Sequence, residues 1–65
     1  MRKRVIDGIV FYLYRVTRRK RIANIIATQI RARGHYARII PSSRGYEIWV
    51  SANPRWFYKW VISDI

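Results

Sequence analysis

Apolar positions between residues 17 and 33 recur with the period of an α-helix. Residues spaced three and four apart form one apolar stripe, and basic and polar residues fall on the opposite side. Thr17 suits the N-cap position, and Gly34 suits the left-handed residue that follows a helix. We therefore predict an amphipathic helix over residues 17–33. Its apolar stripe consists of Ile22, Ile25, Ile26, Gln29 and Ile30.

A strand is predicted before this helix. Residues 9–16 are dominated by β-branched and aromatic side chains, which favour extended structure. A helix over residues 5–16 is the alternative, because the apolar residues there also have helical spacing. Asp7 and Gly8 form a turn signal that could close a small hairpin with residues 4–6.

Two further strands are predicted after the helix. Residues 35–40 and 46–51 are separated by a Pro-Ser-Ser-Arg-Gly turn, and the second stretch alternates between two faces. This arrangement predicts an antiparallel hairpin. The signals in the aromatic segment 55–62 conflict: Asn53 before Pro54 favours a short helix, whereas the side chains that follow prefer a strand.

These elements define a small α+β domain of order β-α-β-β, with one helix packed on an antiparallel-type sheet and an aromatic C-terminal segment that is a short helix or an extra strand. One domain covers residues 1–65, and residues 1–4 are expected to form a flexible basic arm. Strand alternation places Ile9, Phe11, Leu13, Ala37, Ile39, Tyr46, Ile48 and Val50 beneath the helix. It places Val10, Tyr12, Tyr14, Tyr36, Arg38, Ile40 and Trp49 on the other face.

The helix and the hairpin resemble part of a known family. The stretches RIANIIA from residue 21, IRARGHYARII from residue 30 and GYEIWV from residue 45 are similar to the helix-to-hairpin half of SPOR-type domains. The resemblance covers about half of the chain and implies the order helix, glycine, strand, turn, strand. SPOR-type domains bind peptidoglycan from the exported side of a membrane. We expect neither the family's other half nor an export signal in this chain, so we carry over no function and no site residue.

Charge narrows the functional classes further. The chain has 14 Lys and Arg against 3 Asp and Glu, which gives a formal net charge of +11, and it has no cysteine. Like charges repel one another in a compact domain, so a polyanion is the partner that this composition favours. A chain of 65 residues without disulfides also has a small core. Self-association or a larger assembly is a further expectation.

Residues suited to catalysis or metal binding are few. The acids Asp7, Glu47 and Asp64 are far apart in the sequence, and His35 is the only histidine. No pair is spaced for general acid–base work, and one histidine cannot hold a structural zinc. We therefore expect no enzyme, no cofactor, no metal and no small-molecule substrate.

The chain begins with basic residues and an apolar run, which needs to be distinguished from a targeting signal. Asp7 interrupts the run and Arg15 ends it, well short of the roughly 20 residues that span a membrane. We expect a soluble, intracellular protein, cytoplasmic or in a nucleoprotein assembly. We do not expect it to be secreted or to have a membrane partner.

The sharpest local feature is the basic run of residues 18–21. It falls at the predicted helix start, where positive charge opposes the helix dipole and where a bound anion would be favoured. A solvated charge run is the alternative interpretation. Residues 42–45 of the predicted turn are a weaker phosphate-contacting candidate. The candidate phosphate-contacting residues are Arg2, Lys3, Arg4, Arg18, Arg19, Lys20, Arg21, Arg31, Arg33 and Arg38.

Aromatic residues on the predicted open face form a second candidate site. Single-stranded nucleic acids stack their bases on aromatic and arginine side chains. The candidate stacking residues are Tyr12, Tyr14, Tyr36 and Trp49. Alternatively, the C-terminal segment covers this face, or a homodimer or larger assembly does so through Trp49, Trp56, Phe57 and Trp60.

The sequence thus favours a non-catalytic nucleic-acid-binding module that contacts the phosphate backbone of DNA or RNA, within a ribonucleoprotein or a viral nucleoprotein. One alternative is a small viral-type protein that binds and modulates a host protein. Another is a peripheral membrane or cell-wall binder. DNA versus RNA, single versus double strand, sequence specificity, source and oligomeric state stay open.

Overall fold

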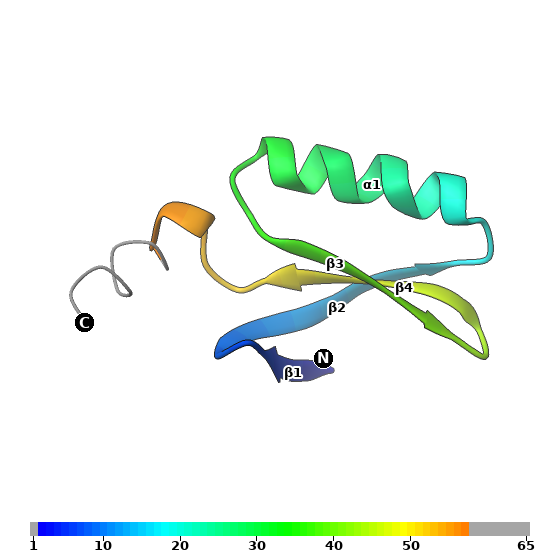
Figure 1. The fold of residues 1–65 in the computed structure, drawn as a ribbon, viewed down its shortest axis with the longest axis horizontal. Helices are drawn as coiled ribbons and strands as arrows, with labels where there is room; N and C mark the ends of the chain where they lie inside the picture. The colour runs from blue at the N-terminus through cyan, green and yellow to red at the C-terminus, as the bar shows by residue number, and fades with distance from the viewer. Residues whose placement is uncertain (1, 58–65) are drawn as a thin grey trace.

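The computed structural model of the chain describes residues 2–57, in which a helix of 13 residues packs on a twisted antiparallel sheet (Figure 1). The predicted α+β class is therefore confirmed. The elements are β1 (Lys3–Ile6), β2 (Ile9–Thr17), α1 (Lys20–Ala32), β3 (Ala37–Ser42) and β4 (Gly45–Ser51). The sheet has the strand order β1-β2-β4-β3. Residues 55–57 are helical, and the rest of the predicted segment 55–62 lies outside the described residues.

The N-terminal residues form a strand rather than the predicted basic arm. Lys3 and Arg4 belong to β1 and pair with β2, so the observed order is β-β-α-β-β. The turn between these strands consists of Asp7 and Gly8, which both have positive φ, at 53° and 78°. Two residues with positive φ fit the right-handed twist of a tight hairpin. The Asp-Gly turn signal correctly located this hairpin.

The N-cap of the helix lies two residues later than predicted. Thr17 is not the N-cap, because it is the last residue of β2 and pairs with Tyr46 of β4. Arg19 occupies the N-cap position and makes no side-chain capping hydrogen bond. The helix end agrees with the prediction, since Gly34 follows α1 with φ of 92° and donates its N–H to the Arg31 carbonyl at 3.0 Å.

Small residues bring α1 close to the sheet. Ala23, Ala27 and Ile30 are buried and pack against Ala37 of β3 and Ile48 of β4. The prediction of which face of β3 and β4 lies beneath the helix is therefore correct. The predicted apolar stripe is only partly buried: Ile22 and Ile25 are exposed, because the alanines, and not these isoleucines, face the sheet.

A bulge in β2 changes which of its side chains face the helix. Leu13 pairs with Trp49 and Arg15 pairs with Ile48, so Tyr14 is an extra residue in β2. Before the bulge, the odd-numbered residues of β2 face away from α1; after it, the odd-numbered residues face α1. The predicted assignment of β2 is therefore wrong. Phe11 and Leu13 share the helix-free face with Trp49, while Tyr12 and Tyr14 lie on the helix side.

Candidate nucleic-acid interface

Four consecutive cations lie at the junction of β2 and α1. Arg18 and Arg19 connect the two elements, and Lys20 and Arg21 begin the helix. All four side chains are exposed, and no acidic residue lies in the first turn. The first N–H groups of a helix have no partner within it, and the dipole is positive at this end. The predicted position of the basic run at the helix start is correct.

The β3–β4 turn lies against this junction. A Cβ added to Gly45 would be 2.5 Å from the Thr17 carbonyl oxygen and 3.0 Å from the Arg18 Cα, so the turn backbone and the β2–α1 connection are in close contact. Arg44, in the same turn, is exposed beside the run of four. We call these five cations, Arg18, Arg19, Lys20, Arg21 and Arg44, the basic end.

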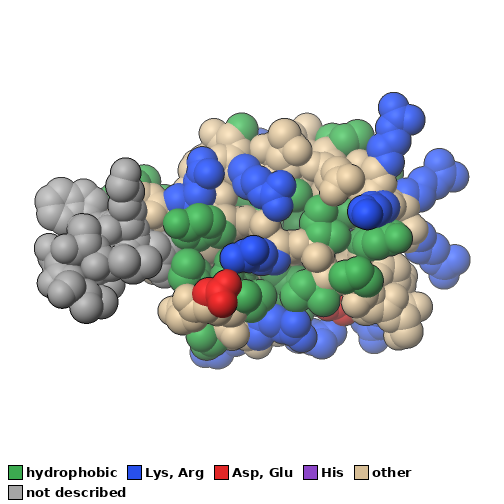
Figure 2. Space-filling model, in the orientation of Figure 1, with side chains coloured by type: hydrophobic (Ala, Val, Ile, Leu, Met, Phe, Trp, Pro, Cys, Tyr) green, Lys and Arg blue, Asp and Glu red, His purple; other side chains and the backbone are tan. Residues whose placement is uncertain are grey.

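Figure 2 shows the arrangement from outside, in the orientation of Figure 1. Several basic side chains project into solvent at the end of the molecule where α1 begins. The sequence prediction named Arg18–Arg21 separately from the turn, because only the fold shows that the turn returns to the helix start.

Three other predicted cations lie on the helix-free face of the sheet, where each has a contact within the fold. The guanidinium carbon of Arg4 lies 4.6 Å from the ring centroid of Trp49, and that of Arg2 lies 5.9 Å from it. Arg38 forms an ion pair with Asp7 at 3.2 Å. The aliphatic parts of such arginines can cover apolar surface while the charge stays in water. Part of this charge therefore contributes to the fold itself.

Arg31 and Arg33, two further predicted cations, lie at the far end of α1. Arg31 donates to the carbonyl oxygen of Ala37 at 2.9 Å, and Arg33 is the C-cap residue. Arg55 donates to the carbonyl oxygen of Arg31 at 2.9 Å. A helix of 13 residues is about 20 Å long, so this group is separate from the basic end. Lys3 belongs to none of these groups, because it pairs with Tyr12 and so lies on the helix side of β1. The predicted phosphate contacts are thus spread over several surfaces rather than one.

The predicted stacking residues do not share a face. Trp49 is 1% exposed, and its Nε1 donates to the buried Glu47 carboxylate at 3.1 Å. A base cannot stack on a ring that is covered in this way. Tyr36 pairs with Ser51 next to this face through two hydrogen bonds, at 3.0 Å and 2.9 Å. Tyr12 and Tyr14 lie on the other face, so the four residues do not form one platform.

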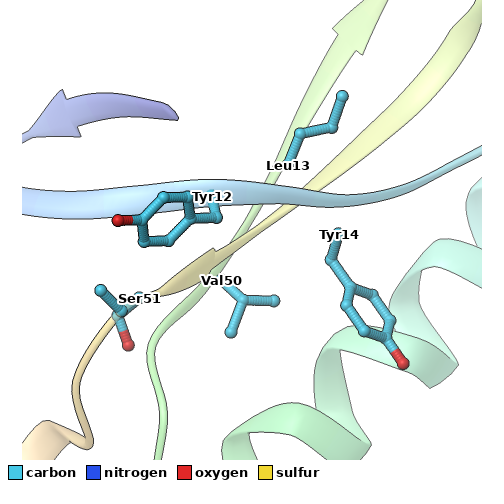
Figure 3. A pocket seen from close by; sticks show the side chains of 6 residues that line it. Tyr12, Leu13, Tyr14, Val50 and Ser51 are labelled. Carbon is cyan, nitrogen blue, oxygen red and sulfur yellow. The ribbon is translucent and has the colours of Figure 1, made fainter. Parts of the chain in front are cut away.

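Tyr12 and Tyr14 instead line two adjoining hollows on the helix side. The larger, of about 310 Å³, lies over β2 and β4 and includes both tyrosines, Val50 and Ser51 (Figure 3). The smaller, of about 180 Å³, lies between Tyr14, Val50 and the C-terminal half of α1. Figure 3 shows Leu13 pointing to the opposite side of β2 from the tyrosines.

Across residues 2–57 the positive charge is largely uncompensated. Every Lys and Arg in this range is exposed, and Arg38 with Asp7 is the one ion pair formed there. The Glu47 side chain is buried, so its carboxylate is not available to basic side chains in solvent. In this part of the chain no three His, Cys, Asp or Glu side chains are grouped to hold a metal ion. The helix of this range is also too short and too polar to cross a membrane.

Comparison of the chain with protein-family models, with curated proteins and with solved structures gave no match.

Proposed function

We propose that this protein binds nucleic acid without catalysis, and that its basic end contacts the phosphate backbone. The observation that carries the proposal is the placement of five exposed cations at one end of the fold. Arg18–Arg21 lie at an uncapped helix start, and Arg44 lies in the turn whose Gly45 packs against this junction. Arginine side chains and free helix N–H groups are both suited to phosphate oxygens.

The energetic argument concerns where this charge is placed. A cation in the first turn of a helix is unfavourable by about 0.3–1 kcal/mol at low ionic strength. The basic end has two such cations in the first turn and two more directly before it. A bound phosphate reverses the sign of these interactions, so an anionic ligand stabilises the arrangement. The location of the basic end at the helix start therefore supports phosphate binding more strongly than the net charge does alone.

The recognition proposed here is of charge and shape rather than of base sequence. Phosphate contacts position a protein on nucleic acid but carry no direct sequence information. Each neutralised duplex phosphate contributes about 0.9 to the slope of log affinity against log salt, and each single-strand phosphate about 0.7. Binding through the basic end should therefore be strongly salt-dependent.

The experiment is a comparison of ligands at equal ionic strength. Fluorescence anisotropy would measure binding to a generic duplex, a generic single strand, anionic vesicles and an acidic polypeptide at several salt concentrations. Tight binding to the oligonucleotides with a slope of several units supports the proposal. Binding to vesicles without affinity for either oligonucleotide would replace it with the membrane alternative.

A protein partner is the second candidate, and one observation favours it. Trp56 is 64% exposed and makes an edge-on ring contact with Phe57 at 6.4 Å. Exposed aromatic residues of this kind are enriched where proteins bind one another. Association that persists at high salt and is lost in Trp56→Ala would support this second function, either with another protein or with a second copy.

A further inference from the structure

The surface between β2 and the C-terminal half of α1 is incompletely covered by the fold. The helix packs mainly over β3 and β4 through its alanines, so the helix side of β2 is left open. Tyr14 is 57% exposed there, and Tyr12 and Val50 are half-buried. The two hollows described above share Tyr14 and Val50 and so adjoin one another, and we treat them as one site.

The walls of this site are aromatic and its floor is aliphatic. Tyr12, which pairs with Val50, and Tyr14, the bulged residue, both point to the helix side of β2 (Figure 3). The larger hollow, at about 310 Å³, is at the small end of ligand pockets, which range from about 300 to 1,000 Å³. Its size fits one planar ring system rather than a large ligand.

The rim of the site is positively charged. Arg33 lines the smaller hollow, and the guanidinium carbon of Arg15 lies 5.7 Å from the centroid of the Tyr14 ring. No Asp or Glu lines either hollow. A ligand that combines a flat aromatic group with negative charge is therefore complementary to the site.

We infer that this site holds an unpaired nucleobase of a single-stranded DNA or RNA segment, stacked on Tyr14, with its phosphate beside Arg33. This inference rests on the proposed function and adds a preference for unpaired bases to it. Bases that are free of a duplex stack on aromatic side chains regardless of their identity, because every base has an aromatic face. The protein would therefore bind a single strand with unpaired bases more tightly than a ligand that offers only a phosphate backbone.

The test compares two probes with equal numbers of phosphates. One is an oligothymidylate of about twelve nucleotides, and the other is an abasic backbone of the same length. One stacked base contributes about 1–3 kcal/mol, which corresponds to a roughly fivefold to 150-fold tighter Kd for the oligothymidylate. The wild-type protein should show this preference at every salt concentration, because stacking does not depend on counterion release.

Three variants locate the preference. Tyr14→Ala should abolish it while leaving affinity for the abasic backbone unchanged, and Tyr14→Phe should keep it because the ring remains. Trp56→Ala, the matched control, removes another exposed aromatic residue outside the site and should also keep it. Circular dichroism of each variant establishes that the fold is retained.

The outcomes separate the two proposals. Equal affinity of the wild-type protein for both probes, or an unchanged preference in Tyr14→Ala, would overturn the base-binding inference and leave phosphate binding intact. No binding to either probe at low salt would overturn both. If Tyr14→Ala weakens binding of an acidic peptide but does not change binding of oligothymidylate, the site would be assigned to a protein partner instead.

Discussion

Removing arginines from the basic end should affect folding and binding in opposite directions. We consider the triple variant R18A/R19A/R21A, which removes three exposed cations at the start of α1. Three lost phosphate contacts lower the log–log salt slope by about 2.7 for a duplex and by about 2.1 for a single strand. The unfolding free energy should rise by about 1 kcal/mol, because the helix dipole no longer faces these charges.

The assays are anisotropy titrations over a range of salt and thermal unfolding at low ionic strength. In a domain of this size, 1 kcal/mol corresponds to a rise in Tm of about 4–8 °C. The matched control is R4A/R38A/R55A, which also removes three charges but from arginines that have contacts within the fold. Those contacts are with the Trp49 ring, the Asp7 carboxylate and the Arg31 carbonyl.

The control variant should lower the salt slope by less than about 1. Its Tm should not rise, since it loses contacts and gains nothing at the helix start. Equal losses of slope in both triple variants would refute the reasoning, because affinity would then follow net charge rather than the basic end.

Three further predictions concern the fold around the site. Arg19→Asp places a capping acceptor at the N-cap and should raise the free energy of unfolding by about 1–2 kcal/mol while weakening oligonucleotide binding; tighter binding would contradict the phosphate site. Trp49→Phe should lower the free energy of unfolding by about 1–3 kcal/mol in urea titrations, because the buried Glu47 carboxylate loses its donor; Glu47→Gln, which keeps an acceptor, should have a smaller effect. Gly45→Ala should lower the free energy of unfolding by about 2–4 kcal/mol, since the φ of Gly45 is 131° and a Cβ would meet the β2 backbone. Gly8→Ala, with open space around its Cβ, should cost about 1 kcal/mol, and equal losses would argue against this close contact.

The part of the fold that depends on local signals could be predicted from the sequence. The left-handed Gly34 marks the helix end, and the alternation in β4 correctly places Ile48 and Val50 beneath the helix. The Asp7-Gly8 turn also marks the first hairpin, because two positive φ angles suit these residues.

The part that depends on long-range pairing could not be predicted. Both faces of β2 are apolar, so its alternation does not show which face lies under the helix, and no local signal marks the bulge at Tyr14. Thr17 has the side chain of an N-cap, but its pairing with Tyr46 keeps it in the strand. Strand pairing across the sheet therefore outweighed the preference of Thr17 for the N-cap position.

The same distinction applies to the candidate site. The basic run of residues 18–21 is visible in the sequence, and the structure keeps it at the helix start. The joining of Arg44 to this run depends on the contact between Gly45 and Thr17, which spans 28 residues of chain. The separation of Tyr12 from Trp49 likewise follows from the register of β2 and β4. The basic run could thus be predicted from the sequence, but the approach of Arg44 to it in the folded chain could not.

A titration of ¹⁵N-labelled protein with a generic oligonucleotide, followed by amide chemical shifts, tests the central claim most directly. The account predicts that the largest shifts fall on the amides of residues 18–21 and on Arg44 and Gly45, and that they reverse when salt is added. Shifts that concentrate on β1 and the helix-free face, or that are absent from the basic end, would contradict it.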